Sequence, residues 1–343
     1  MSPSPDRQRF RNEDLVLKVA PHVDRKKWDE DQYEAFLDAL CADRPYQKDA
    51  ILTALRYLLG GRYVNLHALA VENYDSNAVL HDRYGSLAGI ERHLQLPEKL
   101  AASLDLATAT GKSYVLYGLA MIMLAEGAVD RVLVLCPSTT IESGLLEKFR
   151  ELAADKELRD LLPAASKITT PRIINATESI VEGSICVENY HAILEHVGSS
   201  VRDSLKDHGS RTLILNDEAH HVANESGAQI KRWKEFLLDP AYDFRYIIGV
   251  SGTCYIGDEY FADVIYRYSL RQAMEERYVK YVHYVAEMPR TQDPDEKWQL
   301  VRNYHNKTKK ELKTKKLVPL TIVVTPTIAK AKDVTEELKG FLV

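Results

Sequence analysis

The sequence has little of what marks several classes of protein. It holds 4 cysteines among 343 residues, and because none forms a CxxC pair, neither a zinc ribbon nor a disulfide framework is indicated. The N-terminus, MSPSPDRQRF, has no apolar signal-peptide core. The longest apolar run, YVLYGLAMIMLAEG, is shorter than the roughly 20 residues that a membrane-spanning helix needs. These absences predict a soluble, cytoplasmic protein with no membrane contact.

The chain also lacks an excess of basic residues. Its formal net charge is -5 and its pI is about 6.2, so composition gives no global signal for nucleic-acid binding. Net charge does not report distribution, however, and residues 302–316, RNYHNKTKKELKTKK, are dense in lysine. This stretch is either a solvated linker or helix face, or a surface that contacts a phosphate backbone. The sequence leaves both alternatives open.

What the sequence does contain is an alternation of short apolar runs with helical segments. Runs without polar alternation are typical of strands that are covered on both faces, as in a parallel sheet flanked by helices. With 45% hydrophobic residues the chain can bury such a core. The order of elements predicts a doubly wound α/β domain over residues 44–275. The strand candidates are AASLDLA (101–107), RVLVLCP (131–137), RIINA, SICVEN, RTLIL and RYIIGV, and the clearest helices are GKSYVLYGLAMIMLAEG (111–127) and IESGLLEKFRELAAD.

Four segments are expected along the chain. Residues 1–43 form an N-terminal extension, 44–275 the α/β domain, 276–316 a basic linker, and 317–343 the start of a second α/β domain. The last segment repeats a strand–turn–helix pattern once. Because a single unit of this kind cannot bury its own apolar faces, we expect the chain to be the N-terminal portion of a longer protein.

A candidate phosphate-binding loop lies between the first strand and the buried helix. In LATATGKS (106–113) the backbone of Thr108, Ala109, Thr110 and Gly111 would surround an anion at the helix N-terminus. Lys112 would reach the β- and γ-phosphates of ATP, and Ser113 would bind Mg²⁺. The strict P-loop pattern fails at Leu106. The alternative is an ordinary strand–helix turn.

Two acids follow another strand directly, in NDEAHH (216–221). Asp217 would help to hold Mg²⁺, and Glu218 would act as the general base toward water. Adjacent carboxylates raise one pKa unless a cation lies nearby, and Mg²⁺ would supply that cation. A zinc site is the competing interpretation, but His220 and His221 are neighbours rather than i,i+4 and cannot share a helical face.

The order of these motifs resembles the first RecA-like domain of superfamily 2 helicases. ATATGKS, DEAHH and SGT (251–253) resemble motifs I, II and III, and VLVLCPSTTIESGLLEKF (132–149) resembles motif Ia. RPYQ (44–47) resembles the glutamine motif, so Gln47 is expected to read adenine. Within the superfamily the chain is most similar to the restriction subunits of type III restriction enzymes. TIVVTPTIAKAKDVTEEL resembles the start of a second RecA-like domain, so the resemblance covers residues 44–343.

The resemblance implies a RecA-like fold with ATP and Mg²⁺ as cofactors. It assigns Pro137, Ser138 and Thr139 to the nucleic-acid backbone, although Ser138 and Thr139 could equally cap the next helix. It assigns His220, Ser251 and Thr253 to coupling between the ATP site and the domain cleft; for SGT, a plain turn around Gly252 is the alternative. One departure is Ala109, which stands where the family has glycine, in a loop that favours unusual backbone angles.

The implied function is the ATP-binding half of a helicase or translocase acting on double-stranded DNA, as a restriction or phage-defence subunit. Methyltransferase or nuclease subunits are the implied partners. Motifs V and VI are not reached in this sequence, and motif VI supplies an arginine finger in the family, so we expect the chain alone to hydrolyse ATP negligibly. The alternative is a nucleotide-dependent switch or scaffold that binds ATP without translocating.

Overall fold

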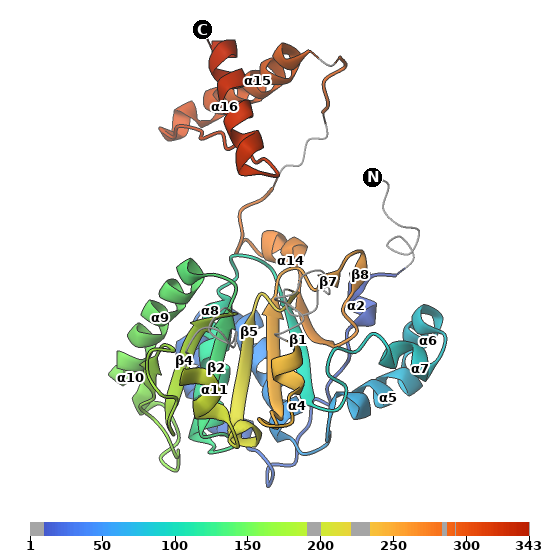
Figure 1. Cartoon of the computed structure of the whole chain (residues 1–343), viewed down its shortest axis with the longest axis vertical. Coiled ribbons are helices and arrows are strands. Elements are labelled where there is room, and N and C mark those ends of the chain that lie inside the picture. Colours follow the sequence, from blue (N-terminus) through green and yellow to red (C-terminus); the bar gives the residue numbers. More distant parts are fainter. Residues whose placement is uncertain (1–9, 191–199, 221–233, 283–286, 292, 343) are drawn as a thin grey trace. The chain divides into compact units, whose positions relative to one another are not determined.

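The computed structural model describes residues 10–190, 200–220, 234–282, 287–291 and 293–342 (Figure 1). The chain forms two compact units, Met1–Tyr281 and Val282–Val343. No helix among the described residues is both long enough and apolar enough to cross a membrane.

The first unit is built on a seven-stranded sheet. Its strand order is β3-β4-β2-β5-β6-β1-β9, and every neighbouring pair is parallel. This arrangement confirms the expected α/β class, a RecA-like domain with a parallel sheet between helices. The strands are β1 Leu100–Leu106, β2 Arg131–Cys136, β3 Arg172–Ile174, β4 Ser184–Asn189, β5 Thr212–Asp217, β6 Tyr246–Ser251 and β9 Val264–Tyr268.

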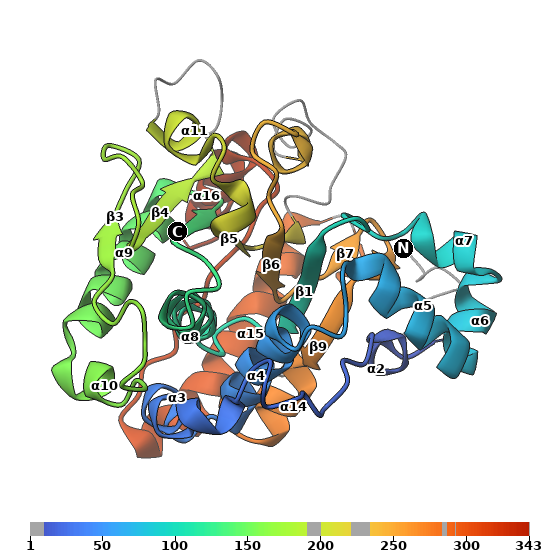
Figure 2. The ribbon, with the colours of Figure 1, turned by 90° about the horizontal axis from the view of Figure 1, so that it is seen from below.

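Helices cover both faces of this sheet. Helices α4 (Pro45–Leu59), α8 (Lys112–Ala125) and α9 (Thr139–Ala154) lie on one face, and α11 (Ser200–Leu205) lies on the other (Figure 2). Because side chains alternate along a strand, each strand contributes to two cores. Leu215 and Ile248, for example, pack on the α8 side, whereas Ile214 and Ile247 pack on the α11 side. The burial of α8 on nearly every side agrees with its uniformly apolar sequence.

Several elements of the first unit carry no strong sequence signal. The N-terminal extension packs onto the edge of the sheet, where the Leu17 N–H donates to the Val264 carbonyl. Strand β9, VIYRY, contains a charged residue inside an otherwise apolar and aromatic run. This residue, Arg267, forms an ion pair with the buried Asp105. The remaining elements are α2 Asn12–Leu15, η1 Glu30–Tyr33, α3 Glu34–Cys41, α5 Leu66–Ser76, α6 Ala78–Tyr84, α7 Leu87–Glu91, α10 Lys156–Asp160, η3 Gly209–Arg211, β7 Tyr255–Ile256, β8 Glu259–Tyr260 and α14 Leu270–Glu275.

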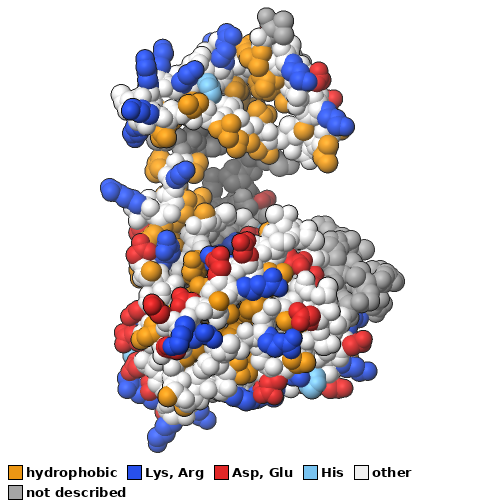
Figure 3. Space-filling view, turned by 90° about the vertical axis from the view of Figure 1, so that its left-hand side faces the viewer, with side chains coloured by type: hydrophobic (Ala, Val, Ile, Leu, Met, Phe, Trp, Pro, Cys, Tyr) orange, Lys and Arg blue, Asp and Glu red, His pale blue; other side chains and the backbone are white. Residues whose placement is uncertain are grey.

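The described residues of the second unit form two helices and a 3-10 turn. They are α15 (Pro294–Leu312), η4 (Lys313–Lys315) and α16 (Ile328–Leu342). Most of the lysine-rich stretch 302–316 is therefore helical and solvent-exposed, which agrees with the helix-face alternative. On the face drawn in Figure 3, this unit (top) shows lysine, arginine and hydrophobic side chains and few acidic ones.

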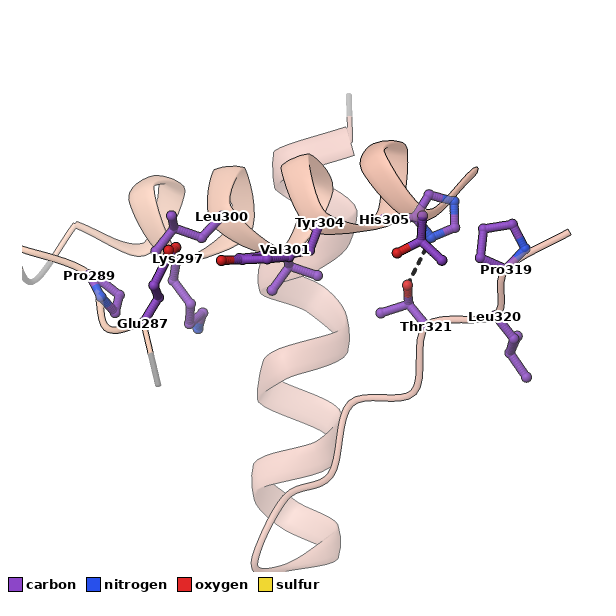
Figure 4. Close-up of a pocket in the computed structure, with 11 residues that line it drawn as sticks. Glu287, Pro289, Lys297, Leu300, Val301, Tyr304, His305, Pro319, Leu320 and Thr321 are labelled. Atoms are coloured by element: carbon purple, nitrogen blue, oxygen red, sulfur yellow. Dashed lines mark hydrogen bonds between the residues drawn. The ribbon is translucent and has the colours of Figure 1, made fainter. Parts of the chain in front are cut away.

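The strand expected at the start of residues 317–343 is not formed. Residues 317–327 are described without any strand, and Val318 and Val324 are 85% and 88% exposed. The expectation was wrong because an apolar run becomes a strand only beside another strand, and the described part of this unit offers none. The segment instead borders a hollow of about 420 Å³ beside α15, where His305 Nδ1 lies 2.9 Å from Thr321 Oγ1 (Figure 4).

Candidate functional site

The predicted motifs meet at one edge of the sheet. Strands β1, β6 and β5 are neighbours, and the candidate loop, the SGT segment and the two acids follow their carboxyl ends in that order. In an open α/β sheet this edge is where ligands bind. The sheet topology thus brings together residues that are more than 100 positions apart in the sequence.

The phosphate-loop segment has a strained, open conformation. Ala109 and Gly111 both have left-handed backbone angles, with φ of 67° and 78°. Thr108 and Ala109 are exposed, whereas Thr110 is buried and donates its hydroxyl to the Ala107 carbonyl at 2.6 Å. No side chain caps the first turn of α8, which leaves its N–H groups available to an anion. These backbone angles and the uncapped start of α8 are compatible with an anion at this loop, and phosphate binding by the predicted loop residues stays a prediction.

This loop is held from behind by the glutamine motif. The Gln47 amide donates to the Thr110 carbonyl at 2.7 Å, and the Tyr46 hydroxyl donates to the same carbonyl at 2.9 Å. A Cβ at Gly111 would lie only 2.5 Å from Gln47 Nε2, so this position requires glycine for space as well as for its φ. Gln47 is 1% exposed. Its contact in this structure is the loop, and its contact with adenine stays a prediction.

Lys112 and Glu218 form an ion pair at the centre of the site. Their side chains are 12% and 24% exposed, so the pair is largely shielded from solvent. Glu218 has a left-handed backbone with φ of 55°, which costs an ordinary residue on the order of 1–3 kcal/mol. Backbone strain therefore lies on both sides of the ion pair, at Ala109 and at Glu218. The strain at Ala109 was indicated by the glycine that is missing there, whereas no sequence signal indicated the strain at Glu218.

The three predicted coupling residues form one hydrogen-bonded cluster beside Glu218. His220 Nδ1 lies 2.9 Å from Ser251 Oγ and 3.1 Å from Thr253 Oγ1. The Ser251 hydroxyl lies 3.3 Å from Glu218 Oε2, and His220 Nδ1 lies 3.4 Å from the same oxygen. The cluster links motif III to the predicted base. His221 lies outside the described residues.

Gly252 adds a direct contact between motif III and the phosphate loop. A Cβ at this position would lie 3.0 Å from the Leu106 carbonyl oxygen and 3.0 Å from the Thr108 nitrogen. Both atoms belong to backbone, which cannot move aside cheaply. The glycine therefore serves close packing against the loop, in addition to any turn that it makes.

The two acids differ in electrostatic environment. Burial raises the pKa of Glu218, but hydrogen bonds from His220 and Lys112 outweigh it and lower that pKa to about 2. Burial raises the pKa of Asp217, and the positive charge of Lys112 opposes this only in part. Glu218 is thus held as a carboxylate, while Asp217 is a buried acid that a cation would stabilise.

Asp217 and Ser113 lie where the sequence predicts the magnesium ligands. Asp217 ends β5 and accepts a hydrogen bond from the Glu218 N–H at 3.1 Å, and Ser113 is partly exposed in the first turn of α8. The described residues contain no group of three or more His, Cys, Asp or Glu that could hold a metal. This donor set suits Mg²⁺, which binds through one or two protein oxygens together with phosphates and water.

Tyr190 is a residue of the site that sequence reasoning did not identify. Its hydroxyl donates to the Asp217 carbonyl at 2.8 Å, and burial raises its pKa well above the ordinary value. It follows β4, two strands away from β5, so no local pattern in the sequence indicated this contact.

The predicted nucleic-acid residues are not part of this cluster. Pro137, Ser138 and Thr139 follow β2, and Thr139 is the first residue of α9. Ser138 accepts a hydrogen bond from the Ile141 N–H at 3.3 Å, so it caps the helix as the simpler alternative expects. Thr139 is exposed, and contact of these residues with nucleic acid stays a prediction.

Comparisons with known proteins identify one matching family. A family model described as type III restriction enzyme, res subunit, matches residues 41–256. No curated protein matches the chain. Two crystal structures of UvsW, described in one case as the UvsW helicase from Bacteriophage T4, are similar at 15% and 16% identity, each with a TM-score of 0.33. The matches cover 54% and 53% of this chain, and 34% and 58% of those chains.

Proposed function

The chain belongs to the family of type III restriction enzyme res subunits, helicase-like proteins of superfamily 2, and from this premise we propose that it is the ATP-binding half of a nucleic-acid translocase or helicase. The proposed cofactors are ATP and Mg²⁺, and the proposed substrate is double-stranded DNA. A role in restriction or phage defence, with methyltransferase or nuclease subunits as partners, belongs to the same proposal.

One observation carries the proposal: the contact between Lys112 of the phosphate loop, Glu218 of motif II and Ser251 of motif III. The three residues lie at the carboxyl ends of three different strands, and a phosphate-loop lysine and an acid beside the phosphates are residue types that nucleotide hydrolysis uses. An ordinary strand–helix turn would not need a lysine paired with a strained glutamate. The phosphate-loop interpretation is therefore favoured over that alternative.

The ion pair suggests how binding would activate the base. A phosphate bound at the first turn of α8 would attract Lys112 away from Glu218. Losing this partner would raise the pKa of Glu218 from about 2 toward its ordinary value and make it a better proton acceptor. Ser113 and Asp217 would hold Mg²⁺, which neutralises charge on the phosphates when bound. A change at Glu218 would be transmitted to the rest of the molecule through the hydrogen-bonded cluster of His220, Ser251 and Thr253.

Nucleotide binding is tested first, by Lys112→Ala. A ligand that binds only the folded state stabilises it by about 2.7 kcal/mol at a hundredfold excess over Kd. We expect a non-hydrolysable ATP analogue with Mg²⁺ to raise the melting temperature of the wild type and to leave Lys112→Ala unmoved. The matched control is Lys156→Ala, at a lysine with a 77% exposed side chain, which should retain the full shift. An equal shift in Lys112→Ala would remove the assignment.

Turnover is tested by Glu218→Gln on the chain joined to a complete second RecA-like domain. Glutamine keeps the shape of the side chain but cannot accept a proton, so DNA-stimulated hydrolysis should fall about 10²–10⁴-fold with nucleotide binding intact. Glu151→Gln, at a 56% exposed surface side chain, serves as the control. Hydrolysis at the wild-type rate in Glu218→Gln would mean that another group is the base.

The second candidate function is a switch that binds ATP without translocating. Ala109 favours it, because a Cβ at φ of 67° strains the loop that must accommodate the phosphates. The two functions predict different ATPase results for the chain joined to a complete second RecA-like domain. Binding of nucleotide with no DNA-stimulated turnover would support the switch.

A further inference from the structure

A small cavity lies inside the sheet domain, on the opposite face of the sheet from α8. Its volume is about 30 Å³, and its polar lining residues are Gln95, Ser103, Asn216 and Asp263, while the rest of its wall is mainly apolar. Asn216 immediately precedes the predicted magnesium acid, and Ala219, also in the wall, immediately follows the predicted base. The cavity therefore lies directly behind the strained turn Asp217–Glu218.

Two oxygens in this wall have no hydrogen-bond partner among the described residues. They are Asn216 Oδ1 and Asp263 Oδ1, in residues that are 3% and 4% exposed. The other oxygen of Asp263 is only weakly bonded, at 3.4 Å from the Ser103 hydroxyl. A buried polar atom without a partner costs roughly 1–3 kcal/mol, so native proteins rarely leave two such atoms in one cavity.

The sheet is built to leave space between these groups. Three residues lie side by side in register on neighbouring strands: Asn216 on β5, Gly249 on β6 and Ser103 on β1. The side chains of Asn216 and Ser103 therefore lie on the same face of the sheet, with Gly249 between them. The middle residue has no side chain, and a Cβ there would lie 2.6 Å from Ala219 Cβ and 3.4 Å from Ser103 Oγ. Glycine inside a buried strand weakens the strand and often marks a close approach. Here the missing side chain of Gly249 leaves the space that the cavity occupies.

We propose that this cavity holds one ordered water molecule, which donates one hydrogen bond to Asn216 Oδ1 and one to Asp263 Oδ1. Above about pH 6, where Asp263 is ionised, both oxygens are acceptors, so neither can satisfy the other, and water supplies two donors from one molecule. A single water needs about 10–15 Å³ of such space and two to four polar partners, and the cavity provides both. The water braces the start of the Asp217–Glu218 turn from behind.

The lining argues against a bound metal cation. Ca²⁺ takes six to eight oxygen ligands and Mg²⁺ a complete octahedron, whereas the wall offers four polar side chains among residues such as Leu96, Leu237 and Phe261. The positive charge of Lys234 lowers the pKa of Asp263 only slightly, against the larger effect of burial. The chemistry of the site is therefore that of solvent bridging two acceptors.

The first test is a high-resolution crystal structure of the unliganded protein. We expect a density peak within hydrogen-bond distance of Asn216 Oδ1 and Asp263 Oδ1. A second crystal, exchanged into rubidium chloride, should show no anomalous signal there. An anomalous peak at that position, or a direct contact between the two side chains in place of the peak, would overturn the proposal.

Two variants separate the bridge from other effects. Asn216→Leu has a similar volume and removes one acceptor, so the peak should disappear and the Lys112–Glu218 contact should shift. Ser103→Ala removes a hydroxyl outside the bridge and should keep the peak. Persistence of the peak in Asn216→Leu would contradict the bridge, and so would loss of the peak in Ser103→Ala. If Asn216→Leu does not fold, the crystals of the wild type and of Ser103→Ala still decide. None of these readouts depends on ATP hydrolysis, so the solvent site can stand or fall separately from the proposed function.

Discussion

The two units use the same kind of sequence with different results. Residues 212–217, TLILND, form β5 and are buried throughout, whereas residues 320–325, LTIVVT, are mostly exposed and form no strand. Among the described residues of the second unit only Trp298 is buried. The difference lies in neighbours: β5 has β2 and β6 on its sides. Apolar, β-branched residues therefore indicate a capacity for strand formation that tertiary contacts must complete.

The units also differ in the setting of their charges. The first unit has 33 Lys and Arg against 42 Asp and Glu, and the second has 12 against 8. In the first unit an ion pair joins Asp105, 5% exposed at its side chain, to Arg267 at 17%. In the second unit the pair Lys297–Glu337 has side chains 41% and 29% exposed. Solvent weakens the second pair, so the two should contribute very differently to stability.

The largest expected effect comes from removing Arg267. Arg267→Ala leaves Asp105 buried without its counter-charge, bonded only to the Tyr260 hydroxyl at 2.8 Å, and detaches Glu13 of the N-terminal extension. Breaking a buried pair costs about 3–5 kcal/mol, and we expect a loss near the lower end because Arg267 is partly exposed. Urea unfolding followed by circular dichroism measures it.

The matched change in the second unit is Lys297→Ala. We expect no measurable shift of the main unfolding transition, since both side chains of this pair reach solvent. Equal losses from Arg267→Ala and Lys297→Ala would show that the two pairs are shielded to the same degree, and the contrast between the units would fail.

The sequence predicted six of the seven strands of the sheet, including the edge strand β3 in RIINA, and missed the other edge strand, β9. The runs RVLVLCP, SICVEN, RTLIL and RYIIGV became β2, β4, β5 and β6 because strands covered on both faces must be apolar. Strand β9 escaped notice because it contains Arg267, whose partner Asp105 is distant in the sequence and is shown by no local pattern.

The candidate site was predictable in residue type and less so in geometry. Short motifs placed Lys112, Asp217 and Glu218, since each must follow a strand to do its chemistry. The strained backbone of Glu218, the contact of Tyr190 with Asp217 and the contact of Gln47 with Thr110 depend on how separate strands and helices pack. No local sequence pattern indicates such packing.

The next effect concerns Asp263, a buried carboxyl group of the first unit. Burial raises its pKa to about 6 from an ordinary value near 3.8, so the folded state binds its proton more tightly than the unfolded state. Stability is therefore lost as pH rises from about 4 to about 6, and the loss is complete above that window. A shift of this size corresponds to at most about 3 kcal/mol.

Asp263→Asn removes this penalty. We expect the variant to be more stable than the wild type at pH 7.5 and to lose that advantage at pH 4, as measured by urea unfolding at both values. The contrasting group is Glu337 in the second unit, whose pKa is lowered, chiefly by its hydrogen bond from Lys297. A pH-independent difference between Asp263→Asn and wild type would show that the carboxyl does not titrate in this window.

A smaller effect is expected from relieving backbone strain. Ala109 and Lys316 both have left-handed angles, with φ of 67° in the first unit and 55° in the second. Glycine removes the Cβ clash but adds flexibility to the unfolded chain, so Ala109→Gly should stabilise the first unit by about 1 kcal/mol or less. Lys316→Gly should leave the main calorimetric transition unmoved. A destabilised Ala109→Gly would mean that the loop is not strained as described.

The smallest effect is expected from Val324→Thr, which is also the most direct test of the contrast between the units, because the same substitution at Val134 is its control. Val324 is 88% exposed in the second unit, and Val134 is fully buried on β2. Threonine has nearly the same shape as valine but carries a hydroxyl, which costs about 1–3 kcal/mol when buried without a partner and almost nothing in water. Val134→Thr should therefore lower the midpoint of urea unfolding, and Val324→Thr should stay within about 0.5 kcal/mol of wild type. If Val324→Thr instead cost as much as Val134→Thr, residues 320–325 would have to be covered in solution, and the apolar run would be a strand after all.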